Sequence, residues 1–418
     1  MSAARSPTLM VVTDAIRHDY VTPEDAPFLH SLTETCSHAK RLRPNFGFCE
    51  RAEMFTGTRP DTNGFFCALN LGEGSDFARW DTGLWRLLDW ESQTGRRVIR
   101  RAMREWFRRV RRITQPIYEI PMRLLPQTVL TEDAFDYHAD LGKFPVETLF
   151  DVLAREGKKT FFEAFPSLRT PACWDHERVK ILLRGLDGAH DYYPMYLGKG
   201  DHIGHVHGPK SAERHAMVRE ADEEVKAIVT RFRERHPEGR FLVFGDHGML
   251  DVERTLSVMP MVRDVARRAG LNIGRDFDLW LDSTLVRMWF RADRALAVLT
   301  EWMSTDATMA AHGQVLSAEK CAALHVPKPG EAYGDLMWLA EPGVLLWPDY
   351  YHHHVQYMGM HGYETHHAGQ QGYAVWHHPE RARVESEEIE GIDICPLVAD
   401  LLEVPIPKDC EGVHPGKR

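Results

Sequence analysis

Aspartate and histidine side chains recur in four short segments that lie far apart in the chain, each after a strand-like apolar run. The candidate residues are Asp14, Asp201, His205, Asp246, His247 and His361. Carboxylate oxygens and imidazole nitrogens suit zinc or manganese, and three of each are enough for two ions that share one substrate oxygen. The sequence therefore predicts a centre of two divalent metal ions.

A single cysteine, Cys49, begins a short helical pattern within the stretch Asn45–Gly57. A thiol at a helix N-terminus is activated by the unpaired backbone N–H groups, and Arg51 adds a positive charge two residues on. Two interpretations stay open, because a free cysteine between aromatic residues is also typical of a small buried apolar side chain. Cys49 is the candidate catalytic nucleophile, and Glu50 and Arg51 are candidates for contacting the substrate.

The elements that must position these residues have the pattern of an α/β fold. Apolar runs at Thr8–Thr13, Asp191–Leu197 and Arg240–Phe244 predict buried strands of a parallel sheet. The carboxyl ends of such strands form the edge where ligands bind, and Asp14 and Asp246 follow two of them directly. The pattern also predicts a strand over 159–164 and helices over 27–35, 149–157, 211–235 and 394–402. We expect a central, mostly parallel sheet with helices on both faces.

Residues 75–145 have a different composition and are interpreted as a helical insert. Nine arginines lie in Arg96–Arg112, where the apolar residues Val98, Ala102, Trp106 and Val110 recur every four positions. This spacing predicts an amphipathic basic helix. Its arginines are interpreted as the solvated face of a cap, as a peripheral contact with an anionic membrane, or as a site for a phosphate-rich partner.

A smaller α+β lobe is predicted over residues 277–357, with a strand at 283–290, a helix at 294–303 and a hairpin at 334–347. The catalytic domain then consists of 1–74, 146–276 and 358–418, and the insert and the lobe interrupt it.

Composition limits the class of protein. Of 418 residues, 43% are hydrophobic and 27% charged, which is typical of a globular enzyme, and no apolar run is long enough to span a bilayer. Seven scattered cysteines without a CxxC pair and no secretory signal predict a cytoplasmic protein. The net charge of −10 argues against a nucleic-acid partner, and nothing indicates an oligomeric state.

The order of the motifs resembles the alkaline phosphatase superfamily, and within it the nucleotide pyrophosphatase/phosphodiesterase branch. Asp14 follows the first strand, as in that family, and the Asp-x-x-x-His-x-x-Gly-Pro signature is matched at Asp201–Pro209. Asp-His-Gly-Met is present at Asp246–Met249 and His-Gly-Tyr at His361–Tyr363. The resemblance covers nearly the whole chain except the arginine-rich insert.

The resemblance implies an alkaline-phosphatase-like fold in which Asp14, Asp246 and His247 hold one metal and Asp201, His205 and His361 hold the other. Zinc is the metal implied first, and manganese is the alternative. It also implies hydrolysis of a phosphodiester or phosphoanhydride bond in a small molecule. Alternatives are a phosphomonoester or sulfate-ester hydrolase, a headgroup transferase of the same fold, and a non-catalytic metal-containing binding protein.

The chain departs from the family at the nucleophile. Family members carry Thr, Ser or a modified Cys ten positions before the glycine that matches Gly57, and that position is Gly47 here. Three hypotheses follow: the thiolate of Cys49 faces the metals, water activated by the metals attacks, or turnover has been lost.

Overall fold

The computed structural model describes residues 6–80, 93–107, 109, 117–167, 173–327, 332–352 and 355–417. The chain divides into two compact units. The first consists of Met1–Phe65, Glu132–Val252 and Tyr357–Arg418, and the second of Phe66–Thr131 and Glu253–Gln356. Most of the predicted insert therefore falls into the same unit as most of the predicted smaller lobe.

The first unit is built on a six-stranded sheet. The strands in spatial order are β16 (Glu385–Glu390), β2 (Ser37–Arg43), β15 (Gly372–His377), β6 (Arg240–Phe244), β1 (Thr8–Thr13) and β5 (Tyr192–Leu197). β1 pairs in parallel with β5 and β6, β16 pairs in parallel with β2, and β15 runs antiparallel to both of its neighbours. The predicted mostly parallel central sheet is confirmed.

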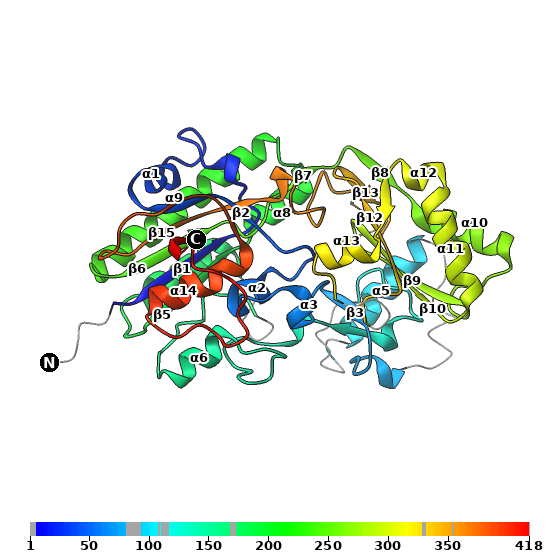
Figure 1. Ribbon diagram of the computed structural model, residues 1–418, viewed down its shortest axis with the longest axis horizontal. Helices are drawn as coiled ribbons and strands as arrows, with labels where there is room; N and C mark the ends of the chain where they lie inside the picture. Colours follow the sequence, from blue (N-terminus) through cyan, green and yellow to red (C-terminus); the bar gives the residue numbers. More distant parts are fainter. Residues whose placement is uncertain are drawn as a thin grey trace. The chain divides into compact units, whose positions relative to one another are not determined.

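Helices cover both faces of this sheet. Successive side chains of a strand point to opposite sides, and in the central strands both sides are apolar and need to be covered. In β1, Leu9 and Val11 pack in one core cluster, while Met10 and Val12 pack in another. The first cluster receives α1 (Pro27–Thr35), α7 (Asp175–Gly185) and α9 (Ala212–Arg235). The second receives α2 (Glu50–Thr56), α6 (Leu149–Arg155) and α14 (Ile394–Leu402). Figure 1 shows α1 and α9 on one side of the sheet and α6 and α14 on the other.

The carboxyl edge of β1, β5 and β6 collects the segments that carry the candidate ligands. Asp14 follows β1, α8 (Lys199–His207) follows β5, and Asp246 follows β6. β14 (Gly359–Met360) pairs with β7 (Leu250–Asp251), so the segment before β15 is held against the one after β6. The short helix α3 (Pro60–Asn63) and 3-10 turns complete the unit at His18–Tyr20, Glu132–Ala134, Ala368–Gln370, Gly391–Asp393 and Pro415–Lys417.

The second unit contains a four-stranded antiparallel sheet. Its order is β11 (Gly313–Val315), β12 (Leu336–Ala340), β10 (Leu285–Phe290) and β9 (Phe277–Leu281). Two further pairs join β3 (Leu69–Leu71) to β4 (Thr128–Leu130) and β8 (Arg254–Leu256) to β13 (Val344–Leu346). The helices are α5 (Gln93–Trp106), α10 (Val258–Ala269), α11 (Asp293–Thr305), α12 (Ala307–Ala310) and α13 (Ala318–Ala323), with 3-10 turns at Ala78–Trp80 and Leu125–Gln127. No helix in the described part of the chain is both long and apolar enough to cross a membrane.

The predicted strand over 159–164 is wrong. The segment forms a single bridge, between Thr160 and Tyr192, rather than a ladder. Phe161 and Phe162 do alternate between the two core clusters, as in a strand. A turn in which Phe165 N–H donates to the Phe162 carbonyl then interrupts the extended backbone, and Ala164 keeps one hydrogen bond to β5, from the N–H of Tyr196 at 3.4 Å.

The predicted hairpin over 334–347 is also wrong, because its two strands pair with different partners. β12 lies between β10 and β11, whereas β13 pairs in parallel with β8. The carbonyl of Gly343, between the two strands, accepts hydrogen bonds from the N–H groups of Glu253 and Arg254 at 2.8 and 3.1 Å. These contacts direct the chain to β8.

The predicted apolar side of the arginine-rich helix is wrong as well. In α5, Ala102 is exposed and Trp106 is 37% exposed, whereas Arg100, Met103 and the following Phe107 are buried. The helix thus buries positions spaced by three and four residues that include an arginine. Arg108, Val110, the end of the predicted helix and the side chain of Val98 lie outside the described part of the chain.

Arg100 is buried because the backbone supplies acceptors for its guanidinium group. Its N–H groups donate to the carbonyl oxygens of Tyr118 at 2.9 Å and Ile120 at 2.6 Å. These hydrogen bonds, together with an ion pair between Nε and Glu119 at 3.7 Å, offset the cost of burying the cation. Arg100 is therefore not available to a membrane or a partner, whereas Arg101 and Arg104 are exposed.

Candidate metal centre and active site

Two backbone N–H groups fix the carboxylate of Asp246 beside that of Asp14. One oxygen of Asp246 accepts hydrogen bonds from the N–H groups of Ala15 at 3.2 Å and His247 at 2.9 Å. Ala15 has a φ of 55°, a strained conformation that turns the chain after β1 toward β6. The other oxygen of Asp246 accepts a hydrogen bond from the hydroxyl of Tyr196 at 3.4 Å.

Two glycines allow the segments at this edge to approach one another closely. A Cβ at Gly200 would lie 2.1 Å from the carbonyl oxygen of Asp14, and a Cβ at Gly245 would lie 2.1 Å from that of Ile16. Any side chain at either position would separate the segments. The local sequence thus brings α8 and the residues after β6 against the turn that contains Asp14.

His247 directs its Nε2 at the carboxylate of Asp14. Its Nδ1 lies 2.8 Å from the carbonyl oxygen of Gly248, and since a carbonyl can only accept, Nδ1 carries the proton. Nε2 lies 3.1 Å from an oxygen of Asp14. Two electron-pair donors at this distance repel each other unless a proton or a metal ion lies between them. This arrangement fits a metal site.

Asp201 and His205 repeat the arrangement one turn apart on α8. Nδ1 of His205 donates to the carbonyl oxygen of Gly359 at 2.9 Å, and Nε2 lies 3.0 Å from an oxygen of Asp201. Nε2 of His361 lies 3.5 Å from the same oxygen. That oxygen is buried and accepts no hydrogen bond. An orphaned carboxylate oxygen that faces two imidazole nitrogens fits a cation, which would satisfy all three.

Aromatic packing fixes the orientation of the imidazole rings. The rings of His205 and Tyr357 stack with centroids 4.6 Å apart, and Phe48 and His361 pack edge-to-face with centroids 5.5 Å apart. The centroids of His205 and His361 are 5.2 Å apart. Each ring is thus held with its ligand nitrogen toward the same region.

Three groups of side chains have ligand atoms that all lie within 4.8 Å of one another in the described part of the chain. They are Asp201, His205 and His361; Asp14, Asp201 and His247; and Glu50, His247 and His361. The structure therefore brings together five of the six predicted ligands and adds Glu50. Asp246 lies beside them, with its Oδ1 4.0 Å from Nε2 of His247.

The centre concentrates negative charge in a buried place. Burial raises the pKa of Asp14 well above its usual range, and the charges of Asp246 and Asp201 raise it further. Burial lowers the pKa of His361 well below its usual range, and the neighbouring His247 adds to this effect. Burial opposes the protonation of His247, but the charge of Asp246, followed by contacts with Asp14, holds its pKa well above the usual value. A divalent cation relieves such an excess of carboxylate charge.

The segment Asn45–Gly57 places its candidates differently from one another. Cys49 is the N-cap of α2, and its side chain packs against the core cluster that contains α6 and α14. Cys49 belongs to none of the three ligand groups found among the described residues, whereas Glu50, the next residue, does. Gly47, the position of the family's nucleophile, has a φ of 128°.

The guanidinium group of Arg51 is paired with two carboxylates of the segment Glu132–Ala134. It forms ion pairs with Asp133 and with Glu132, whose nearest oxygen lies 3.7 Å from Nε. Glu132 is buried and also accepts a hydrogen bond from the hydroxyl of Tyr137 at 2.8 Å. These contacts hold Arg51, a predicted substrate contact, against Glu132–Ala134.

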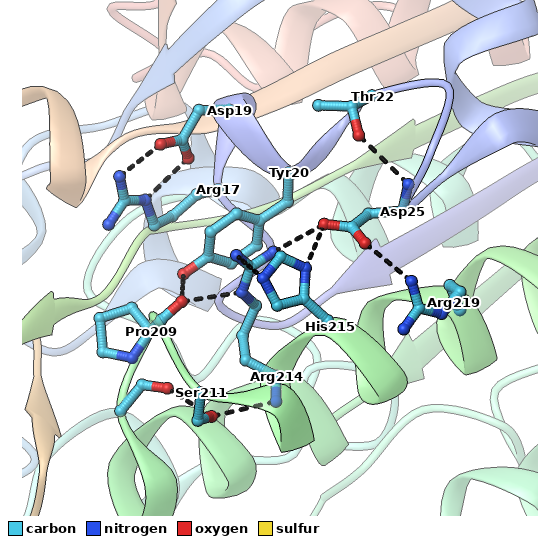
Figure 2. A network of polar contacts seen from close by, with 11 residues as sticks. Arg17, Asp19, Tyr20, Thr22, Asp25, Pro209, Ser211, Arg214, His215 and Arg219 are labelled. Carbon is cyan, nitrogen blue, oxygen red and sulfur yellow. Dashed lines mark hydrogen bonds and ion pairs between the residues drawn. The ribbon is translucent and has the colours of Figure 1, made fainter.

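A polar network joins the two motifs that carry the candidate ligands. Figure 2 shows Tyr20 between the guanidinium groups of Arg17 and Arg214, which lie 5.2 and 4.1 Å from its ring centroid. Arg17 donates to the carbonyl oxygen of Met249 at 2.9 Å, and Arg214 donates to that of Pro209 at 2.7 Å. The ends of the Asp246–Met249 and Asp201–Pro209 motifs are therefore tied to the same tyrosine.

The carboxylate of Asp25 anchors this network to α9. It accepts from Arg214 at 3.2 Å, from His215 at 2.5 Å and from Arg219 at 3.0 Å (Figure 2). Because these three side chains come from one helix, Asp25 fixes the chain that follows β1 on α9.

Sequence reasoning missed several residues that shape the site. Tyr196 bonds Asp246, Tyr357 stacks on His205, and Phe48 packs on His361. Tyr196 lies within the predicted strand 191–197, and no local pattern distinguishes it there. Phe48 adjoins Cys49, so its position next to the candidate nucleophile was the one available signal.

The fold and the site define a metal-dependent hydrolase. A family model for type I phosphodiesterase / nucleotide pyrophosphatase matches residues 8–364, so the chain belongs to this family. The predicted resemblance is confirmed, and with it the prediction of a metal-dependent enzyme that hydrolyses phosphodiester or pyrophosphate bonds. A comparison with curated proteins finds no match.

Solved structures with the same fold include ectonucleotide pyrophosphatase / phosphodiesterase 5 from human and mouse. The human protein is 14% identical, with a TM-score of 0.66 and 96% of each chain covered. The murine protein is 15% identical with the same TM-score and coverage, and an inactive variant of it was solved in complex with AMP. At this identity the likeness shows the fold.

Proposed function

We propose that this chain uses two divalent metal ions to hydrolyse a phosphodiester or pyrophosphate bond of a nucleotide. Asp201, His205 and His361 would hold one ion, and Asp14, Asp246 and His247 the other. The observation that carries the proposal is the buried oxygen of Asp201, which accepts no hydrogen bond although two imidazole nitrogens face it at 3.0 and 3.5 Å. Zinc is the proposed metal, since it favours imidazole nitrogen and carboxylate oxygen in small coordination numbers.

When bound, two such ions neutralise charge on the phosphate oxygens and orient the substrate. The side chains of this protein contribute fixed geometry. The backbone hydrogen bonds of Asp246, the Nδ1 bonds of His205 and His247, and the Tyr20 network hold the ligands in place before substrate arrives. Such preorganisation lowers the barrier because little reorganisation is needed during the reaction.

The attacking group in this proposal is water rather than the thiol of Cys49. Gly47 has no side chain, and Cys49 packs against the core cluster of α6 and α14. Attack by water forms one bond to phosphorus while the bond to the leaving-group oxygen breaks, that oxygen leaves with the electron pair, and the proton lost by the water passes to solvent. A nucleotide as substrate is supported by the family and by the complex of the murine relative with AMP.

The experiment compares three substrates on one preparation of the full chain: a nitrophenyl nucleotide phosphodiester, nitrophenyl phosphate and nitrophenyl sulfate. We expect the diester to be hydrolysed best, with loss of activity on chelation and recovery with Zn²⁺. His247→Ala should lower kcat/KM for the diester by about 10²–10³-fold. Preference for the monoester or the sulfate, or activity that is indifferent to chelation, would contradict the proposal. A nucleotide attached to an added acceptor, instead of free product, would indicate a transferase.

A further inference from the structure

The first residue of α2, Glu50, directs its carboxylate at the metal centre. One oxygen of Glu50, one nitrogen of His247 and one nitrogen of His361 lie within 4.8 Å of one another. The two histidines belong to different proposed metal sites, so Glu50 faces the region that the two sites share. A carboxylate and two imidazoles at this spacing are a ligand set that zinc accepts.

The surroundings of α2 hold the backbone of Glu50 in a fixed place. Near the N-terminal end of α2, the buried carboxylate of Glu53 accepts a hydrogen bond from the N–H of Asn45 at 2.8 Å. At the other end, the carbonyl of Gly57 accepts the N–H groups of Glu411 at 2.8 Å and Gly412 at 3.1 Å. Because both ends of α2 are anchored, the position of Glu50 is set by the fold.

The two nearby positions considered for a nucleophile, Gly47 and Cys49, supply no ligand atom beside Glu50 among the described residues. Gly47 brings no side chain there, and the φ of 128° at this residue favours glycine. Cys49 takes part in none of the ligand groups of the described residues. Of these three residues, Glu50 alone offers an atom within ligand range of His247 and His361.

We infer that Glu50 is a ligand of the metal centre, and that its carboxylate closes the side of the centre that faces α2. This inference rests on the proposed two-metal function. It assigns to Glu50 a role in binding the metals, which differs from the substrate contact that the sequence predicted.

The test measures binding of Zn²⁺ to the metal-free full chain, by competition with a chromophoric chelator. We expect the wild-type chain to bind two zinc ions. Glu50→Gln should lower the affinity of the weaker of the two sites for Zn²⁺ at least about tenfold. Glu24→Gln is the matched control, because it removes the same charge from an exposed residue of the same unit that lies outside the three groups. Asp201→Asn is the positive control and should lose one ion.

Cobalt substitution supplies a second readout that does not depend on activity. The visible spectrum of the Co²⁺ form should change in Glu50→Gln and stay unchanged in Glu24→Gln, since it reports the ligands of the metal. Circular dichroism of the metal-free variants should match the wild type, which separates loss of a ligand from unfolding.

The outcomes distinguish this inference from the proposed function. Wild-type affinity and an unaltered cobalt spectrum in Glu50→Gln, with loss of one ion in Asp201→Asn, would overturn the role of Glu50 and leave the two-metal site standing. If Glu50→Gln and Glu24→Gln weakened zinc binding equally, the effect would come from the loss of negative charge in general. This result would also overturn the role of Glu50 as a ligand. A wild-type chain that binds no zinc, cobalt or manganese would overturn both.

Discussion

The imidazole rings of His247 and His361 stack with centroids 4.1 Å apart and planes 20° from parallel. His247 follows β6 and His361 precedes β15, and these strands are antiparallel neighbours in the sheet. The stack therefore joins one ligand from each proposed metal site. Since Asp201 also appears in two of the three ligand groups, the two sites form one connected centre.

Cys49 can be removed without loss of chemistry if water attacks phosphorus. We predict that Cys49→Ala and Cys49→Ser each keep kcat/KM for a phosphodiester within about threefold of the wild type. Steady-state kinetics on both variants checks this. A loss of several hundredfold in the alanine variant, partly restored by serine, would instead make Cys49 the nucleophile.

Gly57 should tolerate no side chain. Its φ is 68°, and an added Cβ would lie 2.3 Å from Sγ of Cys410. Gly142 has nearly the same φ, 69°, with no atom within 4 Å of its Cβ position. We predict that Gly142→Ala lowers the free energy of unfolding by about 1 kcal/mol and Gly57→Ala by about 2–4 kcal/mol in urea titrations. Equal effects would show that the contact with Cys410 adds nothing to the backbone strain.

Burial raises the pKa of Glu132 from 4.5 to about 7, although Arg51 lowers it. Because the folded value lies above the unfolded one, its stabilising contribution is complete below pH 4.5 and is lost as pH rises through about 7. The loss amounts to at most about 3 kcal/mol. We predict that Glu132→Gln, which keeps an acceptor for Tyr137, flattens this part of the stability curve between pH 4.5 and 8. Identical pH dependence in both proteins would contradict the assignment.

Arg100 should behave as a buried structural residue rather than as part of a basic surface. Arg100→Gln leaves the carbonyl oxygens of Tyr118 and Ile120 without their donors, and we predict a loss of about 2–4 kcal/mol in the free energy of unfolding. Arg101→Gln, at an exposed position of the same helix, should change it by less than about 0.5 kcal/mol. Similar small effects in both variants would argue that Arg100 is solvated.

The sequence predicts the sheet well where a strand leads directly into a motif. The runs before Asp14 and Asp246 are short, apolar and followed by a turn, so local pattern and long-range structure agree. The strand predicted over 159–164 and the hairpin predicted over 334–347 were wrong, because an extended sequence pattern does not indicate which strand will be the partner. The burial of Arg100 could not be predicted from the helical pattern, because the carbonyl oxygens that accept its hydrogen bonds lie in a different segment, at Tyr118 and Ile120.

The candidate site shows the same division. Metal ligands can be proposed from the sequence because their spacing is fixed within each motif, as in Asp201 and His205 on one face of α8. The orientation of the Glu50 carboxylate toward the histidines could not be predicted from the sequence. It depends on the position of α2, which is set by the contacts at both ends of the helix. Neither Asn45 nor Glu411, which set those ends, has a local pattern that indicates this contact.

Anomalous diffraction from crystals grown with Zn²⁺ tests the central claim most directly. The two-metal account predicts two peaks per chain, one about 2.0–2.2 Å from ligand atoms of Asp201, His205 and His361, the other equally close to Asp14, Asp246 and His247. A single peak, or peaks only at other residues, would contradict it.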